Sequence, residues 1–203
     1  MYLYGASGHA KVIIDILLRN GQSIKALIDD NRSVQELYGY SVIHNAAEVL
    51  HAKTECIISI GNNKVRKLIA EKWSFTYIIA IEPSAQISRG STIESGTVVM
   101  ANVAVNAGSY IGKHCILNTN CSIDHDCVLE DYVHISPNVA LAGNISVGEG
   151  THIGIGACVI QGIRIGKWAT VGAGTVIIKD VPDYAVVTGN PGKVIRYNNQ
   201  DEE

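Results

Sequence analysis

The chain has 203 residues, of which 47% are hydrophobic and 17% are charged, and its formal net charge is −3. These values fit one or two globular domains and exclude a disordered chain. No basic stripe is present, so nucleic acid is not an expected partner. No apolar run approaches the roughly 18 residues that span a bilayer, and the start lacks the pattern of a signal peptide. We therefore expect a cytoplasmic protein without membrane insertion.

Residues 1–78 alternate expected strands and helices. Strands are predicted at "MYLY", "IKALI", "ECIISI" and "YIIAI", and helices at "HAKVIIDILLRNG" and "KVRKLIAEKW", where apolar residues recur at helical spacing. The turn "GASG" joins the first strand to the first helix. This order predicts a small Rossmann-like α/β domain with a parallel sheet.

A six-residue repeat begins at Ile81. Every sixth residue from Ile81 to Ile177 is Ile, Leu or Val, at all 17 positions, and the residue four places further on is small or medium-sized. Such a period predicts one short strand and one corner per repeat, with three repeats in a triangular coil of about 18 residues. Stacked coils bury the aliphatic column in a continuous interior. We expect this parallel β-helix over residues 79–183, followed by a carboxy-terminal segment, 184–203.

The chain has five cysteines and no CxxC pair. In a reducing cytosol disulfides are not expected. Cys115, Cys121 and Cys127 occupy the small-residue position of successive repeats. We interpret them as packing residues and assign them no nucleophilic role.

His125 stands between Asp124 and Asp126 at an expected corner of the β-helix. Residues 18 apart lie above one another, so Ala107 lies below His125 and Gly143 above it, which leaves room for a ligand beside the ring. The histidine can be a structural corner residue, a metal ligand or a general base. A metal site needs converging ligands, and His134 and His152, one coil apart, are candidates. A base needs a carboxylate that orients its ring.

The repeat resembles the left-handed parallel β-helix of the hexapeptide acyltransferases. Together with "YGASGHAKVIIDIL", "LIDDN", "SIGNN" and "DHDC", it is similar to the bacterial acetyltransferases of nucleotide-linked amino sugars, a group with relatives that acetylate sialic acids. The left hand of the helix is implied by this resemblance and not by the period. The resemblance also implies a homotrimer with the acyl-donor site between neighbouring β-helices.

The resemblance places the general base at His125 and its acidic partner at the next residue, Asp126, with Asp124 as the open alternative. Gly143, stacked over His125, is the candidate backbone N–H donor for the tetrahedral oxyanion, although a turn glycine is an alternative interpretation. The cosubstrate is acetyl-CoA, with direct transfer and no metal. Ile155 and Ala173 share a column that suits contacts to its pantetheine arm, together with Gly143 and with His134, a donor-site residue in the family.

The resemblance also implies a nucleotide-sugar site in the first domain. The end of a first strand and the start of a helix favour phosphate, and acidic residues that end the second strand accept bonds from ribose or base groups. The candidates are Ser7, Gly8, His9, Asp29, Asp30, Gly61 and Asn62.

The resulting hypothesis is an acetyl-CoA-dependent N-acetyltransferase that acts on the 4-amino group of a nucleotide-linked amino-deoxy sugar in glycan synthesis. The nearest alternative is an O-acetyltransferase of a sialic-acid-like sugar. Two further alternatives are a zinc hydratase of the carbonic anhydrase type, with His125, His134 and His152 as ligands, and a non-enzymatic nucleotide-sugar-binding scaffold. The sequence does not distinguish UDP, dTDP and GDP.

Overall fold

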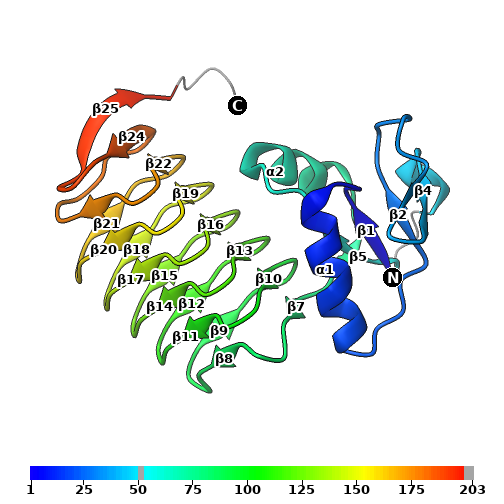
Figure 1. Cartoon of the computed structure of the whole chain (residues 1–203), viewed down its shortest axis with the longest axis horizontal. Coiled ribbons are helices and arrows are strands. Elements are labelled where there is room, and N and C mark those ends of the chain that lie inside the picture. The colour runs from blue at the N-terminus through cyan, green and yellow to red at the C-terminus, as the bar shows by residue number, and fades with distance from the viewer. Residues whose placement is uncertain (50–52, 199–203) are drawn as a thin grey trace.

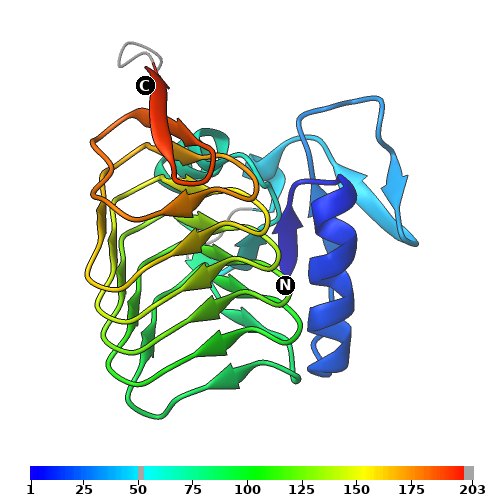
Figure 2. The ribbon, with the colours of Figure 1, turned by 60° about the vertical axis from the view of Figure 1, so that its left-hand side comes forward.

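The fold of the chain is an α/β unit packed beside a parallel β-solenoid (Figures 1 and 2). We describe it from a computed structural model that covers residues 1–49 and 53–198. The α/β unit contains β1 (Tyr2–Tyr4), α1 (Gly8–Arg19), β2 (Ala26–Ile28), β3 (Glu36–Leu37), β4 (Tyr40–Ile43), a 3-10 helix η1 (Ala46–Glu48), β5 (Glu55–Ile58), α2 (Asn63–Lys72) and β6 (Thr76–Tyr77).

The strands of the α/β unit form one six-stranded sheet in the order β3-β4-β2-β1-β5-β6. All neighbours are parallel except β3 and β4, which confirms the predicted parallel sheet. The two sheet faces have separate cores, because successive strand residues point to opposite sides. Leu3 packs with α1 on one face, and Tyr4 packs with Ile69 of α2 on the other.

Two features of this unit differ from the sequence-based expectation. The hairpin of β3 and β4 was not predicted; its turn is Tyr38–Gly39, where both residues have positive φ. The strand predicted at "YIIAI" is two strands. β6 belongs to the first sheet, whereas β7 (Ala80–Ile81) is the first strand of the solenoid. The Ile78 N–H still donates to the Cys56 carbonyl of the first sheet, and two residues later the Ala80 N–H donates to the Thr97 carbonyl of the solenoid.

The solenoid has three faces built from short strands. Face 1 contains β7, β10 (Val98–Val99), β13 (Ile116–Leu117), β16 (His134–Ile135), β19 (His152–Ile153), β22 (Thr170–Val171), β24 (Ala185–Thr188) and the antiparallel β25 (Lys193–Tyr197). Face 2 contains β8 (Gln86–Ile87), β11 (Ala104–Val105), β14 (Ser122–Ile123), β17 (Ala140–Leu141), β20 (Cys158–Val159) and β23 (Val176–Ile177). Face 3 contains β9 (Thr92–Ile93), β12 (Tyr110–Ile111), β15 (Val128–Leu129), β18 (Ser146–Val147) and β21 (Arg164–Ile165).

The stacking register follows the predicted coil length. Val98 pairs with Ile116 and His134 with His152, each 18 residues further on. The last coil is shorter, since Thr170 pairs with Val186, 16 residues further on. The parallel face therefore continues through β24, beyond residue 183.

The interior of the solenoid is the predicted aliphatic column together with the small residues beside it. Ile123 and Ile135 are fully buried, and so is Cys127. Buried hydroxyl groups form hydrogen bonds with the backbone. Thr97 Oγ1 donates to the Gly112 carbonyl at 2.8 Å and accepts from the Cys115 N–H at 3.0 Å. The inner cysteines are free thiols, as their packing role predicts.

The α/β unit is fixed to face 1 by a shared core and by one buried arginine. Val98 and Ile116 of face 1 belong to the same apolar cluster as Ile13 of α1. Arg66 of α2 is 1% exposed and donates to the carbonyls of His114 at 2.8 Å and Tyr132 at 2.9 Å, both in the solenoid. The carboxyl edge of the first sheet thus faces the later coils of face 1 (Figure 1).

No helix in the described ranges, 1–49 and 53–198, has the length and apolar character needed to cross a bilayer.

Candidate active site

His125 lies at the corner between faces 2 and 3, in the turn that links β14 to β15. Its side chain is 61% exposed, and its Nδ1 lies 2.8 Å from Asp126 Oδ2. Asp126 has a φ of +58°, a conformation that Asp tolerates at a turn. The corner therefore turns the carboxylate back toward the ring, which an extended strand would not do.

Asp124 forms hydrogen bonds that stabilise the same corner. Its Oδ1 accepts from the His125 N–H at 2.8 Å and from Asn106 Nδ2 at 2.8 Å. The Asn106 hydrogen bond, followed by that of the His125 N–H, lowers the pKa of the Asp124 carboxyl. The geometry thus favours Asp126 over Asp124 as the group that orients the imidazole.

The two carboxylates change the acid–base properties of His125. The hydrogen bond to Asp126, followed by the charge of Asp124, raises the pKa of His125. With Nδ1 donating to Asp126, the neutral ring has Nε2 as its proton acceptor. The exposed corner can therefore take up a proton at Nε2 and stabilise the resulting imidazolium.

Gly143 lies against the ring of His125, one coil further on. A Cβ at this glycine would stand 2.6 Å from both Cε1 and Nε2 of His125, so only glycine leaves the ring in place. Within residues 1–49 and 53–198, the Gly143 N–H forms no backbone hydrogen bond, whereas the neighbouring Asn144 N–H donates to the His125 carbonyl at 2.9 Å. A backbone N–H group without a backbone partner in those ranges thus lies beside the imidazole of His125.

The predicted donor-site residues lie elsewhere on the same chain. His134, on face 1, stacks on His152 with 4.8 Å between ring centroids, and its Nε2 lies 3.3 Å from Asn118 Nδ2. Burial, followed by the nearby His152 and Arg66, lowers the pKa of His134 to about 3. The ring is therefore neutral.

Ile155 and Ala173 lie at the corner between faces 1 and 2, away from the His125 corner. The Gly174 N–H donates to the Ile155 carbonyl at 2.8 Å, which confirms that these corners stack. Ile155 is 52% exposed. Within one chain the structure does not bring His125 together with His134, Ile155 or Ala173.

The predicted nucleotide-sugar residues gather at the carboxyl edge of the first sheet. Ser7 precedes α1, and Ser7 and Gly8 are both exposed. His9 is half-buried, and burial followed by the charge of Arg66 lowers its pKa to about 4. Gly61 and Asn62 precede α2, which Asn62 caps by accepting from the Val65 N–H at 3.0 Å.

The two aspartates after β2 have different surroundings. Asp29 Oδ2 accepts from the Ala6 N–H at 2.7 Å, and its Oδ1 accepts from the Asn31 N–H at 2.9 Å. The exposed Asp30 accepts only from the Tyr4 hydroxyl, at 3.3 Å, among the contacts of the described residues. Asp29 therefore shapes the loop after β1, and Asp30 is the more available acceptor.

The three histidines of the zinc alternative do not meet within this chain. His134 and His152 stack on face 1, and His125 lies at the opposite corner, between faces 2 and 3. Across residues 1–49 and 53–198, no three His, Cys, Asp or Glu side chains form a cluster that could hold a metal ion.

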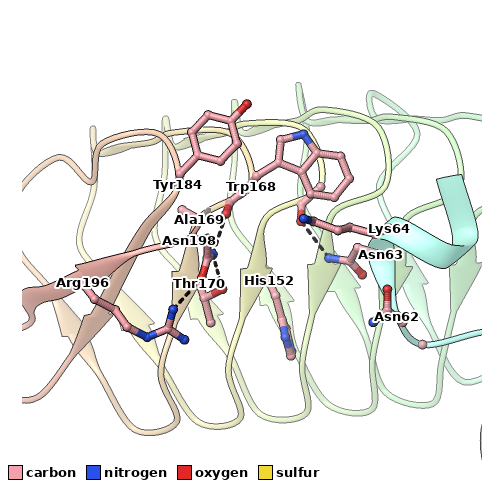
Figure 3. A pocket seen from close by; sticks show the side chains of 12 residues that line it. Asn62, Asn63, Lys64, His152, Trp168, Ala169, Thr170, Tyr184, Arg196 and Asn198 are labelled. Carbon is pink, nitrogen blue, oxygen red and sulfur yellow. Dashed lines mark hydrogen bonds between the residues drawn. The ribbon is translucent and has the colours of Figure 1, made fainter. Parts of the chain in front are cut away.

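Arg66 and a cavity of about 580 Å³ at the amino-terminal end of α2 were not predicted from the sequence. Arg66 looked like an ordinary helix residue, since its carbonyl partners are distant in sequence. The cavity includes Gly61 and Asn62, but also Trp168 and Tyr184 at successive corners between faces 3 and 1 (Figure 3). The placement of two aromatic residues at turn positions of consecutive coils was the available signal.

Residues 1–73 match the family described as the PglD N-terminal domain. The perosamine N-acetyltransferase of Caulobacter crescentus, solved with CoA and GDP-perosamine, is 36% identical; the match covers 96% of each chain with a TM-score of 0.91. The chain belongs to the hexapeptide-repeat acyltransferases. The predicted architecture of this family member, an α/β domain followed by a left-handed parallel β-helix, is confirmed by this match.

Other relatives of this hexapeptide-repeat protein are also acetyltransferases. The acetyltransferase domain of PglB from Neisseria gonorrhoeae, solved with acetyl coenzyme A, is 36% identical with a TM-score of 0.89, and the match covers 96% of this chain and 98% of that one. Serine acetyltransferase 2 of Arabidopsis thaliana is 30% identical, and the match covers 95% of this chain. The chain spans 55% of the length of that plant enzyme and 36% of the related serine acetyltransferase 4.

Proposed function

We propose that this protein transfers an acetyl group from acetyl-CoA to the 4-amino group of a nucleotide-linked amino-deoxy sugar. The observation that carries the proposal is the pair of His125 and Asp126 on an exposed corner, with Nδ1 and Oδ2 2.8 Å apart. Gly143 lies against the ring of His125, and its N–H has no backbone acceptor among the described residues. The relatives solved with CoA and GDP-perosamine and with acetyl coenzyme A support the two substrates.

The proposed chemistry needs a base and an oxyanion donor. A sugar ammonium must lose a proton before its nitrogen attacks the thioester carbonyl. His125 Nε2 accepts a proton from the amine nitrogen as the new C–N bond forms, and Asp126 stabilises the imidazolium. The Gly143 N–H donates to the carbonyl oxygen as it gains negative charge, and collapse of the intermediate expels the CoA thiolate. The acetyl group passes directly from sulfur to nitrogen.

The complete site needs more than one copy of the chain in this proposal. His125 lies at a different corner from His134, Ile155 and Ala173. A homotrimer would bring the His125 corner of one copy beside the acyl-donor residues of the next. The acetyl-CoA arm then lies along the stacked corners at Ile155 and Ala173, and the nucleotide is held by the carboxyl edge of the first sheet.

Steady-state kinetics of His125 variants test this proposal. His125→Ala and His125→Asn are expected to lower kcat by about 10²- to 10⁴-fold, the usual contribution of a general base. Cys158→Ser, a change of an exposed side chain on face 2, is the matched control and should leave kcat unchanged. Turnover that survives in both His125 variants would exclude the base, and transfer to a hydroxyl instead of an amine would favour the O-acetyltransferase.

A further inference from the structure

The corner that contains His125 lies on the segment of residues 106–109, one coil earlier. The register of β11 and β14 pairs Val105 with Ile123, so the residues that follow these strands stack in the same order. The sequence "NAGS" of the earlier coil therefore lies below "DHDC" of the later one, with Gly108 below Asp126.

Hydrogen bonds join the two segments in addition to the bond from Asn106 to Asp124. The Asp126 N–H donates to the Ala107 carbonyl at 3.0 Å. Ser109 Oγ accepts from the next N–H along the later coil, that of Cys127, at 3.1 Å. The backbone of the corner is thus fixed by the earlier coil, and the direction of the Asp126 side chain depends on what lies beneath it.

The carboxylate of Asp126 occupies the space that a side chain at position 108 would fill. A Cβ on Gly108 would overlap Oδ1 of Asp126. Both residues lie in the left-handed region, with φ values of +77° and +58°. Oδ2 of the same carboxylate lies 2.8 Å from His125 Nδ1. Because position 108 has no side chain, the carboxylate is able to turn onto the imidazole.

Other corners show that a side chain in the left-handed region leans toward the residue 18 positions earlier. A Cβ on Gly96 would overlap the imidazole of His114, and a Cβ on Gly150 would overlap the indole of Trp168. His114 and Trp168 both have positive φ. Asp126 therefore follows a geometry that the solenoid repeats at its corners.

Where the earlier residue has a side chain, the two stacked side chains contact each other. Asn120 and Asn138 both have positive φ, and Asn120 Nδ2 donates to Asn138 Oδ1 at 2.7 Å. The rings of His114 and Tyr132 stack with 5.4 Å between their centroids. By the same geometry, a polar side chain at position 108 would bind the Asp126 carboxylate and draw it away from His125.

We infer that Gly108 is a positioning residue for the base, because the lack of a side chain there directs the Asp126 carboxylate onto Nδ1 of His125. This role rests on the proposed function, in which His125 accepts the proton of the amine. Asp126 and Asp124 are the charged groups that act on the ring. Residues 106–108 below it and 142–144 above it contain no titratable side chain. Displacement of the Asp126 carboxylate therefore removes the larger of the two influences that raise the pKa of His125.

NMR titration of the His125 imidazole in the full chain tests this inference without a sugar substrate. Asn tolerates a positive φ, so Gly108→Asn should fold and should move the titration midpoint to lower pH, close to that of Asp126→Asn. Gly108→Ala, with a smaller side chain, should move it in the same direction. Gly21→Asn, at a φ of +69° with no atom within 4 Å of the new Cβ, is the control and should titrate like the wild type. A wild-type midpoint in both Gly108 variants would overturn the inference.

Thermal unfolding separates positioning from folding. The atom that a new side chain would displace is the end of a carboxylate whose side chain is 66% exposed, so it can move into solvent. The Tm of Gly108→Asn should therefore stay within about 4 °C of the wild type. A shifted midpoint together with a far larger loss of Tm would show a disrupted corner and would count against a positioning role.

Steady-state kinetics tests whether Gly108 acts through Asp126. Gly108→Asn should lower kcat by about 10- to 100-fold, as expected for Asp126→Asn, with the KM of acetyl-CoA changed by less than about twofold. The double variant should be no slower than Asp126→Asn alone, because both changes remove the same contact. A double variant whose loss is the product of the two single losses would overturn the inference. If the wild type acetylates no sugar, the proposed function fails, and the NMR titration still decides whether Gly108 positions Asp126.

Discussion

His125 and Asp126 show how one corner of a repeat brings an imidazole and a carboxylate into contact. The repeat fixes the turn, the positive φ of Asp126 turns the carboxylate back, and Nδ1 and Oδ2 come within 2.8 Å. A glycine one coil away leaves room for the ring. The pair is exposed, and the hydrogen bond to Asp126 raises the pKa of the His125 imidazole.

The pH profile of kcat/KM tests which aspartate controls His125. The hydrogen bond of Asp126 raises the pKa of His125, and activity falls at low pH where the base becomes protonated. Asp126→Asn removes the larger cause, so the acid limb of the profile should move to lower pH, with a loss in kcat of about 10- to 100-fold. Asp124→Asn is the matched comparison and should shift the limb less. An equal or larger shift in Asp124→Asn would identify Asp124 as the orienting acid.

Gly143→Ala tests the close approach of the backbone to the ring. The new Cβ would meet His125 at 2.6 Å, so the imidazole must move away from the proposed oxyanion donor, the Gly143 N–H. We expect kcat to fall by about 10²- to 10³-fold, the cost of a lost oxyanion-hole donor. Gly90→Ala, where the nearest atom is 3.7 Å from the new Cβ, is the control and should retain activity. Full activity in Gly143→Ala would exclude the arrangement.

The sequence predicts this corner because the six-residue period assigns each residue of the solenoid to a strand or to a corner. Ala107, His125 and Gly143 follow from the stacking of 18-residue coils, and the observed register confirms that spacing. The partner of His125 could not be chosen this way, since the choice depends on the backbone angle of one turn. The cavity around Trp168 also escaped prediction, because residues 62, 168 and 196 meet only when α2 and β25 are in place.

At the level of elements, α2 connects the loop before it to the solenoid through Arg66. Its guanidinium donates to Ile60 and Gly61 of that loop, and to His114 and Tyr132 of two successive coils. None of these acceptors is a carboxylate. The candidate substrate loop is therefore positioned by carbonyl groups that only a planar, five-donor cation can satisfy together.

Arg66→Lys is expected to destabilise the protein although the charge is kept. An ammonium has three donors in a compact group and leaves several buried carbonyls unpaired, at about 1–3 kcal/mol each. We expect the free energy of unfolding to fall by about 2–4 kcal/mol in denaturant titration. Arg89→Lys, at an exposed site, is the control and should change little. A similar stability of the two variants would show that Arg66 does not hold the loop.

On the scale of the whole molecule, the α/β unit and the solenoid share a core and enclose neutral histidines between them. Ile13 of α1 packs with Val98 and Ile116 of face 1. Burial lowers the pKa of His9 to about 4 and that of His134 to about 3, and both values include the charge of Arg66. These histidines are therefore neutral in the folded protein at pH values where the unfolded chain would protonate them.

The free energy of unfolding should decrease as the pH is lowered below about 6.5. A depressed histidine pKa means that the unfolded state binds more protons below about pH 6.5, so stability is lost as the pH falls from there toward 4. We expect a loss of roughly 1–2 kcal/mol per histidine at about pH 5, read as a lower Tm in thermal unfolding. His134→Gln should flatten this dependence. The exposed His125 has the opposite sign, since its raised pKa favours the folded state at low pH. A Tm that is constant between about pH 7 and 5 would contradict the buried neutral rings.

The most direct test of the central claim is mass spectrometry of the products formed from acetyl-CoA and a panel of UDP-, dTDP- and GDP-linked 4-amino sugars. The predicted result is one added acetyl group on the amine of at least one sugar, with free CoA released in equal amount, and product formation at least about 10²-fold slower with His125→Ala. Release of CoA without an acetylated sugar, or no product from any member of the panel, would contradict it.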